Sequence, residues 1–337
     1  MLTLDEQKRL DKIKEEFDFN GQVISQCAMY LNHTPDALNE QLINEITGGE
    51  KSLERGAVAT FLSSVFCEDE KDARFFFSEY YSKMVKNLDK EEYEKNPYYK
   101  NIKIPKSEME GWTLGSQKYK PYELFIWDDL QIDGYRERPQ LGYFDSEFEF
   151  PTVFEKGIEW MAIKPNEIET MKEPIEKARG NVLVLGLGLG YYTYMISNKK
   201  EVSSITVVER DKSVIALFER YILPQFENKE KITVVNMDAF EYLDNHMKNE
   251  SFDFSFADLW HDISDGTELY LRLRKKEYLS SKTEYSYWIE RSILSGVRAN
   301  IFHAVYENIK NGKLEKSIDE IEKMISYDSI KELTRYI

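Results

Sequence analysis

The stretch Asn181-Val-Leu-Val-Leu-Gly-Leu-Gly-Leu-Gly190 decides the fold of this chain. Its first part, Val182 to Leu185, is apolar on both faces, as a central parallel strand must be, because helices cover both sides of such a sheet. The glycines that follow carry no Cβ atom, so the backbone can adopt positive φ and approach a bound nucleotide closely. The stretch therefore predicts the first strand and loop of a nucleotide-binding α/β domain.

The spacing of the glycines limits the class of ligand that the loop can bind. A dinucleotide fingerprint, G-x-G-x-x-G/A, would place its third small residue at position 191, which is Tyr191. A phosphate-binding P-loop is excluded because no G-K-[ST] follows. The observed pattern of Gly186, Gly188 and Gly190 resembles class I S-adenosylmethionine-dependent methyltransferases, in particular their spermidine-synthase-like relatives. Taken alone, the glycines could also form a simple tight turn.

Four apolar segments fit the strands of this domain, and each gap between them leaves room for one helix. They are Val182 to Leu185, Ile205 to Val208, Ile232 to Val235 and Phe252 to Ala257. Right-handed crossovers give the spatial order 3-2-1-4, so the ligand crevice opens at the carboxyl ends of the first and fourth strands. We therefore expect the chemistry just after each strand.

Acidic residues follow the second and third strands. Glu209, followed by Arg210, can accept hydrogen bonds from both hydroxyls of a ribose. The segment Asp238-Ala239-Phe240 is similar to the family's G-D-A segment, which implies that Asp238 accepts from the adenine amino group and Phe240 covers the ring. Asp238 is also a good N-cap for the helix that follows, and both roles are compatible.

The expected cofactor-binding residues come from these three segments. They are Gly186, Leu187, Gly188, Gly190, Glu209, Arg210, Asp238, Ala239 and Phe240. Two positions depart from the family pattern, because Met237 replaces the glycine before the aspartate and Val184 replaces the acid that many methyltransferases carry. Spermidine-synthase-like chains commonly have an aliphatic residue at the position of Val184, so this departure favours that branch. Tyr191 and Tyr192 pack either on the adenosine or on the sheet.

The fourth strand leads into Ala257-Asp-Leu-Trp-His-Asp262. In spermidine synthases the corresponding aspartate takes the proton from the attacking amine, and a second acid follows three residues later with a proline after it. Asp258 matches the first acid, but Asp262 is four residues on and no proline follows. We expect Asp258 and His261 to be the catalytic residues, since either can orient a nucleophile or accept a proton. The alternative is that Asp258 caps a loop and His261 is merely exposed.

After Phe150-Pro151 a helix is expected from about Phe154 to Met161. The segment between this helix and the first strand has two interpretations. In methyltransferase-like proteins it often covers the methionine end of the cofactor, so Asn166, Glu167 and Thr170 could bind the ammonium or carboxylate there. The favoured interpretation is that these residues cap a helix, since Pro165-Asn166 before Glu167 is an ordinary start signal.

Residues after Gly266 depart from the family, which continues with a helix, a fifth strand and a hairpin. Here Glu268 to Leu279, Glu284 to Leu294, Ala299 to Ile309 and Ser317 to Tyr327 all have helical patterns. Either Ser292 to Ala304 conceals a strand or the segment before residue 150 completes the sheet. Four residues here are candidate substrate contacts, with core packing as the favoured interpretation: Tyr285, Tyr287, Trp288 and His303.

The first half of the chain has a different sequence pattern. Residues 1–95 are expected to be helical, with helices from Thr3 to about Asp18, after Thr34-Pro35 up to Gly48, from Lys51 to Phe66 and from Glu70 to Leu88. Its aromatic residues, Phe75, Phe76, Phe77, Tyr80 and Tyr81, form an ordinary core or, alternatively, a substrate lid or the interface of a homodimer. Residues 96–150 form a β-rich connector, and residues 151–337 form the Rossmann-like domain with a helical carboxyl-terminal extension.

Composition limits the partners. The chain has 337 residues and a net charge of −16, and an acidic surface repels nucleic acid and anionic lipid. Cys27 and Cys67 are too far apart in sequence for a thiolate motif, and no spacing of the four histidines suggests a metal site. No apolar run of 18 residues and no apolar leader segment is present, so we expect a soluble, cytoplasmic protein without a membrane partner.

The expected fold class is therefore α/β, a Rossmann-like doubly wound sheet preceded by a helical region and a small β-containing connector. The resemblance implies an enzyme, a methyltransferase that uses S-adenosyl-L-methionine as cofactor and acts on a small molecule or a protein side chain. One alternative is a spermidine-synthase-like aminopropyltransferase. Another is a non-catalytic binding or scaffold protein with a degenerate nucleotide fold.

Overall fold

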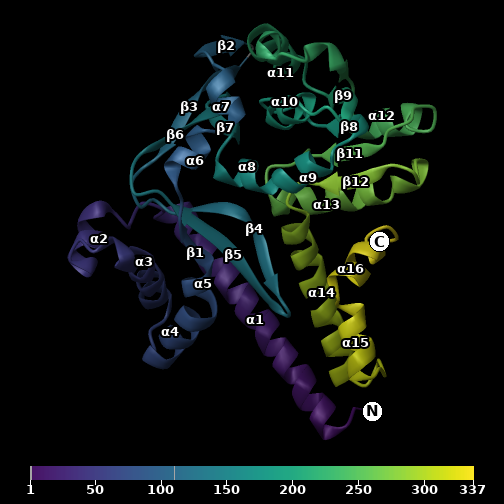
Figure 1. Ribbon diagram of the computed structural model, residues 1–337. Coiled ribbons are helices and arrows are strands. Elements are labelled where there is room, and N and C mark those ends of the chain that lie inside the picture. Colours follow the sequence, from purple (N-terminus) through teal and green to yellow (C-terminus); the bar gives the residue numbers. More distant parts are fainter. Residues whose placement is uncertain (1, 110) are drawn as a thin grey trace. The chain divides into compact units, whose positions relative to one another are not determined.

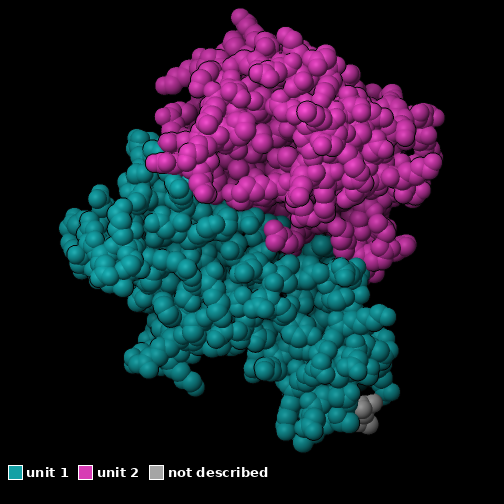
Figure 2. Space-filling view, viewed as in Figure 1, with its two compact units in different colours: residues 1–90, 118–148, 294–330 teal, residues 91–117, 149–293, 331–337 magenta. Residues whose placement is uncertain are grey.

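The computed structural model describes residues 2–109 and 111–337 (Figure 1). The chain forms two compact units, and both are discontinuous in sequence (Figure 2). Unit 1 contains residues 1–90, 118–148 and 294–330, whereas unit 2 contains residues 91–117, 149–293 and 331–337. The boundaries of these units differ from those of the three consecutive regions described above, because parts of the connector and of the carboxyl-terminal extension belong to unit 1. Each unit is described by itself below.

Unit 1 begins with helices, as expected. They are α1 (Leu4–His33), α2 (Glu40–Thr47), α3 (Lys51–Phe66), α4 (Glu70–Phe76), the π-helical η1 (Phe77–Tyr81) and α5 (Ser82–Met84). Helix α1 continues well past Asp18 to His33, because its buried face extends through Val23, Cys27 and Tyr30. The pair Thr34-Pro35 does not start α2, whose N-cap is Asn39.

The aromatic stretch of unit 1 belongs to its core. Phe76, Tyr80 and Tyr81 are buried, and the partly buried Phe75 and Phe77 pack against the same cluster. This arrangement confirms the expectation of an ordinary helical core for these rings. The expected helix from Glu70 to Leu88 instead contains the π-helical turn and ends at Met84, because the next residues join a sheet.

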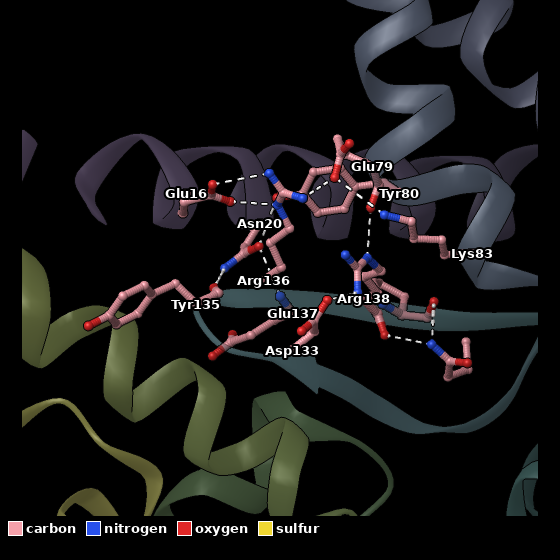
Figure 3. Close-up of polar contacts among 12 residues, drawn as sticks. Glu16, Asn20, Glu79, Tyr80, Lys83, Asp133, Tyr135, Arg136, Glu137 and Arg138 are labelled. Carbon is pink, nitrogen blue, oxygen red and sulfur yellow. Dashed lines mark hydrogen bonds and ion pairs between the residues drawn. The ribbon is translucent and has the colours of Figure 1, made fainter. Parts of the chain in front are cut away.

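The sheet of unit 1 has the order β1-β5-β4, formed by β1 (Val85–Asn87), β5 (Arg136–Tyr143) and β4 (Phe125–Asp133). Buried Asn20 of α1 connects it to the helices (Figure 3). Its Nδ2 donates to the carbonyl of Tyr135 at 2.7 Å, and its Oδ1 accepts from the Tyr80 hydroxyl and the Glu137 N–H, both at 3.0 Å. These bonds satisfy polar groups that would otherwise be costly to bury.

Three helices complete the carboxyl-terminal part: α14 (Glu290–Lys310), α15 (Ile318–Met324) and α16 (Tyr327–Leu333). Within unit 1, apolar residues of α14 and α15 pack against the first half of α1. The rings of Phe17 and Phe302 stack with centroids 4.3 Å apart. The suggestion that Ser292 to Ala304 conceals a strand is wrong, because this stretch lies inside α14.

Unit 2 carries an antiparallel sheet of order β2-β3-β6-β7. Its strands are β2 (Ser107–Met109), β3 (Trp112–Tyr119), β6 (Phe148–Glu155) and β7 (Ile158–Ala162). The short helices α6 (Lys90–Glu94) and α7 (Pro97–Asn101) precede it, and α8 (Pro165–Thr170) and α9 (Lys172–Lys177) follow it. The helix expected from about Phe154 to Met161 is wrong, because these residues form the hairpin β6–β7.

The parallel sheet of unit 2 has the order β10-β9-β8-β11-β12 (Figure 1). Its strands are β8 (Gly180–Leu185), β9 (Val202–Glu209), β10 (Ile232–Asn236), β11 (Phe254–Ala257) and β12 (Glu284–Tyr287). The connecting elements include α10 (Tyr191–Ser197), α11 (Lys212–Leu217), the π-helical η2 (Phe218–Ile222), the 3₁₀ turns η3 (Leu223–Gln225) and η4 (Lys229–Lys231), α12 (Ala239–His246), α13 (Ile263–Arg274) and the 3₁₀ turn η5 (Glu277–Leu279). The order 3-2-1-4 and the Rossmann-like fold class are confirmed.

The fifth strand corrects the sequence interpretation. We expected a helix from Glu284 to Leu294, but Glu284–Tyr287 pairs with β11 in parallel register, with Tyr287 opposite Ala257. The sheet is therefore completed from this segment and not from the strands before residue 150. The short, partly exposed strand has no continuous apolar run, so its pattern did not distinguish it from a helix.

Candidate functional site

The glycine turn lies at the carboxyl end of β8. Gly186, Gly188 and Gly190 have φ angles of 98°, 50° and 71°, in the region that glycine adopts without strain. A Cβ atom on Gly186 would overlap the backbone carbonyl of Asp258, and one on Gly188 would overlap the sulfur of Met161. These two glycines are thus required by close packing as well as by backbone conformation.

Met161 of β7 lies directly on this turn. The backbone N–H of Leu189 donates to the thioether sulfur of Met161 at 3.2 Å. Sulfur is a weak acceptor, so this contact orients the turn without binding it firmly. This contact could not be predicted from the sequence, because Met161 belongs to no motif and precedes the first glycine by many residues.

Glu209 ends strand β9 and reaches the same turn. Its Oε2 accepts from the N–H of Leu187 at 3.2 Å, and its Oε1 accepts from the N–H of Asp211 at 2.8 Å. Burial raises the pKa of Glu209, although these backbone donors oppose the effect. The neighbouring Arg210 is exposed, and its carbonyl accepts from the Asn236 amide at 2.9 Å.

Asp238 is exposed and caps helix α12. Its Oδ1 accepts from the N–H groups of Phe240 at 2.9 Å and of Glu241 at 3.2 Å. Ala239 is buried, whereas the half-buried ring of Phe240 lies under the guanidinium of Arg272, 3.9 Å from the ring centre. The expected helix-capping role is therefore present, and Arg272 is a neighbour that the sequence did not reveal.

Asp258 follows strand β11 directly. Its backbone N–H donates to the carbonyl of Leu185 at 2.9 Å, which holds it beside the end of β8. The residue as a whole is half-buried, but protein surrounds its carboxyl group, and burial raises the pKa of Asp258 to about 7. A carboxyl group with such a pKa can accept a proton near neutrality and release it again.

Glu167 of α8 lies near Asp258. Burial raises the pKa of Glu167 well above its usual range, and the charge of Asp258 raises it further. Its Oε2 atom is buried and has no hydrogen-bond partner within the described residues. The N-cap of α8 is Lys164, without a side-chain bond, so the favoured expectation that Asn166 and Glu167 cap this helix is wrong. The reason is that α8 already begins at Pro165, so Asn166 and Glu167 lie within its first turn.

His261 lies near the end of the loop between β11 and α13. Its Nδ1 is 3.1 Å from Oδ2 of Asp265, and its ring meets the edge of Trp160 with centroids 4.2 Å apart. Asp262, the second acid of the motif, is the N-cap of α13 and accepts from the N–H of Ser264 at 2.7 Å. His261 and Asp258 are thus on the same loop, whereas Asp262 is engaged in capping.

The later aromatic candidates are divided between the two units. The hydroxyl of Tyr287 donates to Glu277 at 2.9 Å, and that of Tyr285 donates to the carbonyl of Ser280 at 3.1 Å, as expected for core packing. His303 is in unit 1, with its ring 6.4 Å from that of Phe17.

The three remaining aromatic candidates, Trp288, Tyr191 and Tyr192, lie near the parallel sheet of unit 2. Trp288 follows β12 and donates its indole N–H to Thr170 of α8 at 2.9 Å. Tyr191 and Tyr192 are both buried, and the Tyr192 ring stacks on Phe256 of β11 with centroids 4.2 Å apart. This supports packing on the sheet for Tyr192.

Residues 2–109 and 111–337 contain neither a candidate metal site nor a candidate membrane-spanning helix. No group of three or more His, Cys, Asp or Glu side chains in this part could hold a metal ion. No helix in the same residues is long and apolar enough to cross a membrane.

Two solved structures of spermidine synthases are similar to part of this chain. The crystal structure of spermidine synthase from Thermotoga maritima has 16% identity and a TM-score of 0.32, and the match covers 44% of this chain and 55% of that one. Spermidine synthase in complex with the transition state analogue AdoDATO has 16% identity and a TM-score of 0.31, with 44% and 54% covered. This chain therefore spans about half the length of each protein. No curated protein matches it.

A protein-family model matches part of this chain. The spermine/spermidine synthase domain matches residues 167–282, which contain the glycine turn, Glu209, Asp238 and Asp258. This finding corrects two expectations. Methyl transfer as the activity is wrong, and so is S-adenosylmethionine as cofactor, because spermidine synthases consume decarboxylated S-adenosylmethionine as a substrate. Residues 167–282 are thus similar to a transferase domain with a Rossmann-like fold, in the spermidine-synthase-like branch.

Proposed function

We propose that this protein transfers an aminopropyl group from decarboxylated S-adenosylmethionine to an amine acceptor. The observation that carries the proposal is the buried carboxyl group of Asp258, at the carboxyl end of β11 and in contact with the glycine turn through its backbone. The match of residues 167–282 to the spermine/spermidine synthase domain supports the same assignment.

The chemistry requires one proton acceptor. The acceptor amine attacks the carbon of the aminopropyl arm that is bound to the sulfonium sulfur, so a C–N bond forms as the C–S bond breaks. The electron pair of the C–S bond goes to sulfur, and 5′-methylthioadenosine leaves. The attacking nitrogen gives one proton to Asp258, and binding in line supplies much of the remaining rate enhancement.

The adenosyl group has suitable partners at the other strand ends. We assign the ribose hydroxyls to Glu209, whose carboxylate already accepts from the N–H of Leu187 in the turn and from the N–H of Asp211 after β9. Both capping bonds of Asp238 go to Oδ1, so Oδ2 can accept from the adenine amino group. Phe240, fixed by Arg272, can cover the purine ring. His261, oriented by Asp265, is a second candidate proton acceptor.

An activity assay tests this function. Purified protein is incubated with decarboxylated S-adenosylmethionine and, separately, putrescine, spermidine, spermine or 1,3-diaminopropane. Formation of equal amounts of 5′-methylthioadenosine and aminopropylated amine is expected with at least one acceptor. Binding of the donor without any product would favour a binding or scaffold protein. If the protein neither binds nor converts the donor, the proposal is wrong.

Glu209→Ala is expected to weaken binding of 5′-methylthioadenosine by about 1.5–3 kcal/mol, because a charged acceptor of the ribose hydroxyls is lost. Isothermal titration calorimetry measures the change. Glu201→Ala is the matched control, since this exposed carboxylate immediately precedes the same strand. An affinity for 5′-methylthioadenosine equal to that of the unmodified protein would remove Glu209 from the site.

A further inference from the structure

Ile289, directly after Trp288, has a strained backbone conformation. Its φ angle is 46°, in the left-handed region that a β-branched residue rarely adopts. The residue lies just beyond the carboxyl end of β12, and β12 runs parallel to β11, so this is the edge of the sheet at which Asp258 also lies. Strained conformations of this kind concentrate at functional sites and persist only where the surrounding structure imposes them.

Polar contacts on both sides of Ile289 impose this conformation. Before it, the buried hydroxyl of Tyr287 donates to Oε1 of Glu277 at 2.9 Å. After it, Oε2 of Glu290 accepts from Nζ of Lys331 at 2.6 Å. Both neighbours of the turn are therefore fixed by residues outside it, and the backbone between them has little freedom to relax.

The turn places Trp288 between two other segments. Its backbone N–H donates to the carbonyl of Ala257 at 3.0 Å, one residue before Asp258. Its indole N–H donates to Oγ1 of Thr170 at 2.9 Å, at the end of α8. Only 7% of Trp288 is exposed, so water competes little for these bonds. One residue thus joins α8 to the strand end that carries the proposed base.

The hydroxyl of Thr170 is oriented for its contact with the indole. It donates to the carbonyl of Asn166, one turn earlier in α8, at 2.7 Å. A hydroxyl has one hydrogen, so the oxygen of Thr170 can only accept from Trp288. The bond between α8 and β12 therefore requires a hydroxyl at position 170 and an N–H donor at position 288.

We propose that Trp288 is a positioning residue for aminopropyl transfer. Through its bond to Thr170 it fastens α8 to the end of β11, and this keeps Asp258 in the orientation in which its carboxylate accepts the proton of the attacking amine. The inference rests on the proposed function and adds residues that act through the base without touching the substrates.

Kinetics and calorimetry of full-length variants test the inference. Trp288→Phe removes the indole donor, Thr170→Val removes the acceptor, and Thr170→Ser keeps the hydroxyl. Thr267→Val is the matched control, because the hydroxyl of Thr267 also donates to a carbonyl four residues earlier, that of Ile263 in α13, at 2.8 Å. The measurements are kcat with saturating decarboxylated S-adenosylmethionine and the amine that the unmodified protein converts fastest, and the affinity for 5′-methylthioadenosine.

Trp288→Phe and Thr170→Val are each expected to lower kcat about 10- to 100-fold, because a misplaced catalytic group costs this much, and to change the affinity for 5′-methylthioadenosine by less than about twofold. Both variants break the same bond, so the double variant should be no slower than the slower single one. Thr170→Ser should keep kcat within a factor of about three of the unmodified protein, and Thr267→Val should have no effect.

Two outcomes would overturn the inference in different ways. If Thr170→Val and Thr170→Ser have equal kcat, or if the two single losses multiply in the double variant, the role of Trp288 is wrong while the proposed function stands. Thr170→Val decides the matter if Trp288→Phe does not fold, because valine has nearly the shape of threonine. If the unmodified protein forms no 5′-methylthioadenosine with any amine, the proposed function fails and the inference fails with it.

Discussion

Asp258→Asn is expected to lower kcat for aminopropyl transfer about 10²- to 10⁴-fold, the range that is usual for loss of a general base. Asparagine has nearly the same shape as aspartate but cannot accept the proton of the attacking amine. Binding of 5′-methylthioadenosine should be retained, because the adenosyl group is assigned to other strand ends. Stopped assays of 5′-methylthioadenosine formation with saturating donor and acceptor measure the effect.

The pH dependence provides a second measurement of the same residue. Since burial raises the pKa of Asp258 to about 7, kcat/KM should increase about tenfold per pH unit below that value and level off as the carboxyl group ionises. Glu167 interacts with Asp258, so the observed value belongs to the pair of groups. In Asp258→Asn the residual kcat/KM should no longer increase with pH in this acidic range.

The stability of Asp258→Asn distinguishes loss of catalysis from misfolding. A pKa raised in the folded state contributes stability that is present below the unfolded value of about 4 and is lost as the pH rises through about 7. The variant should therefore have a higher Tm than the unmodified protein at about pH 8 and a similar Tm at about pH 4. A kcat within a factor of about three of the original in a folded Asp258→Asn variant would exclude Asp258 as the base.

Glu137→Ala is expected to reduce the free energy of unfolding by about 3–5 kcal/mol, because it removes one partner of a buried ion pair. Glu137 lies on β5 in unit 1 (Figure 3), and its Oε1 accepts from Arg298 at 2.7 Å and from the Tyr327 hydroxyl at 2.6 Å. The hydroxyl of Ser295 donates to the other oxygen. The substitution would leave the Arg298 guanidinium buried and uncompensated. Urea unfolding followed by circular dichroism measures the loss.

Two comparisons test the physical cause. Glu147→Ala breaks the exposed pair with Lys118, in which both side chains are more than half exposed, and should cost less than about 1 kcal/mol. Glu137→Ala combined with Arg298→Met should recover part of the stability that Glu137→Ala loses, because no buried charge remains. An equal loss in the single and the double variant would show that packing, and not the unpaired charge, dominates.

Four strands of the parallel sheet, β8 to β11, were predictable because each satisfies its local pattern. Val182 to Leu185 is apolar on both faces, and the gaps to the next strands allow only one helix each, so the order followed from the handedness of crossovers. Strand β12 was missed because Glu284-Tyr285-Ser286-Tyr287 alternates weakly and is only partly buried. Its position depends on pairing with β11, which is tertiary information.

The candidate site was predictable where its residues follow strands, as Glu209, Asp238 and Asp258 do. Glu167 was interpreted mainly as a helix cap, because its burial within reach of the charge of Asp258 follows from tertiary packing. Met161 was missed for a related reason: β7 was interpreted as helical, so its contact with Leu189 could not be foreseen. Long-range packing, which no local pattern encodes, determines these parts of the site.

Because unit 1 is discontinuous in sequence, it cannot finish folding until late in synthesis of the chain. Residues 294–330 contribute Arg298 and Tyr327 to the partners of Glu137, and Phe302 to the surface that covers α1. While a ribosome is still translating the middle of the chain, the amino-terminal helices lack these partners and leave apolar side chains exposed to water. Nascent chains that stop before residue 294 should therefore depend on chaperones, and an amino-terminal fragment cut at residue 150 cannot reproduce the native core.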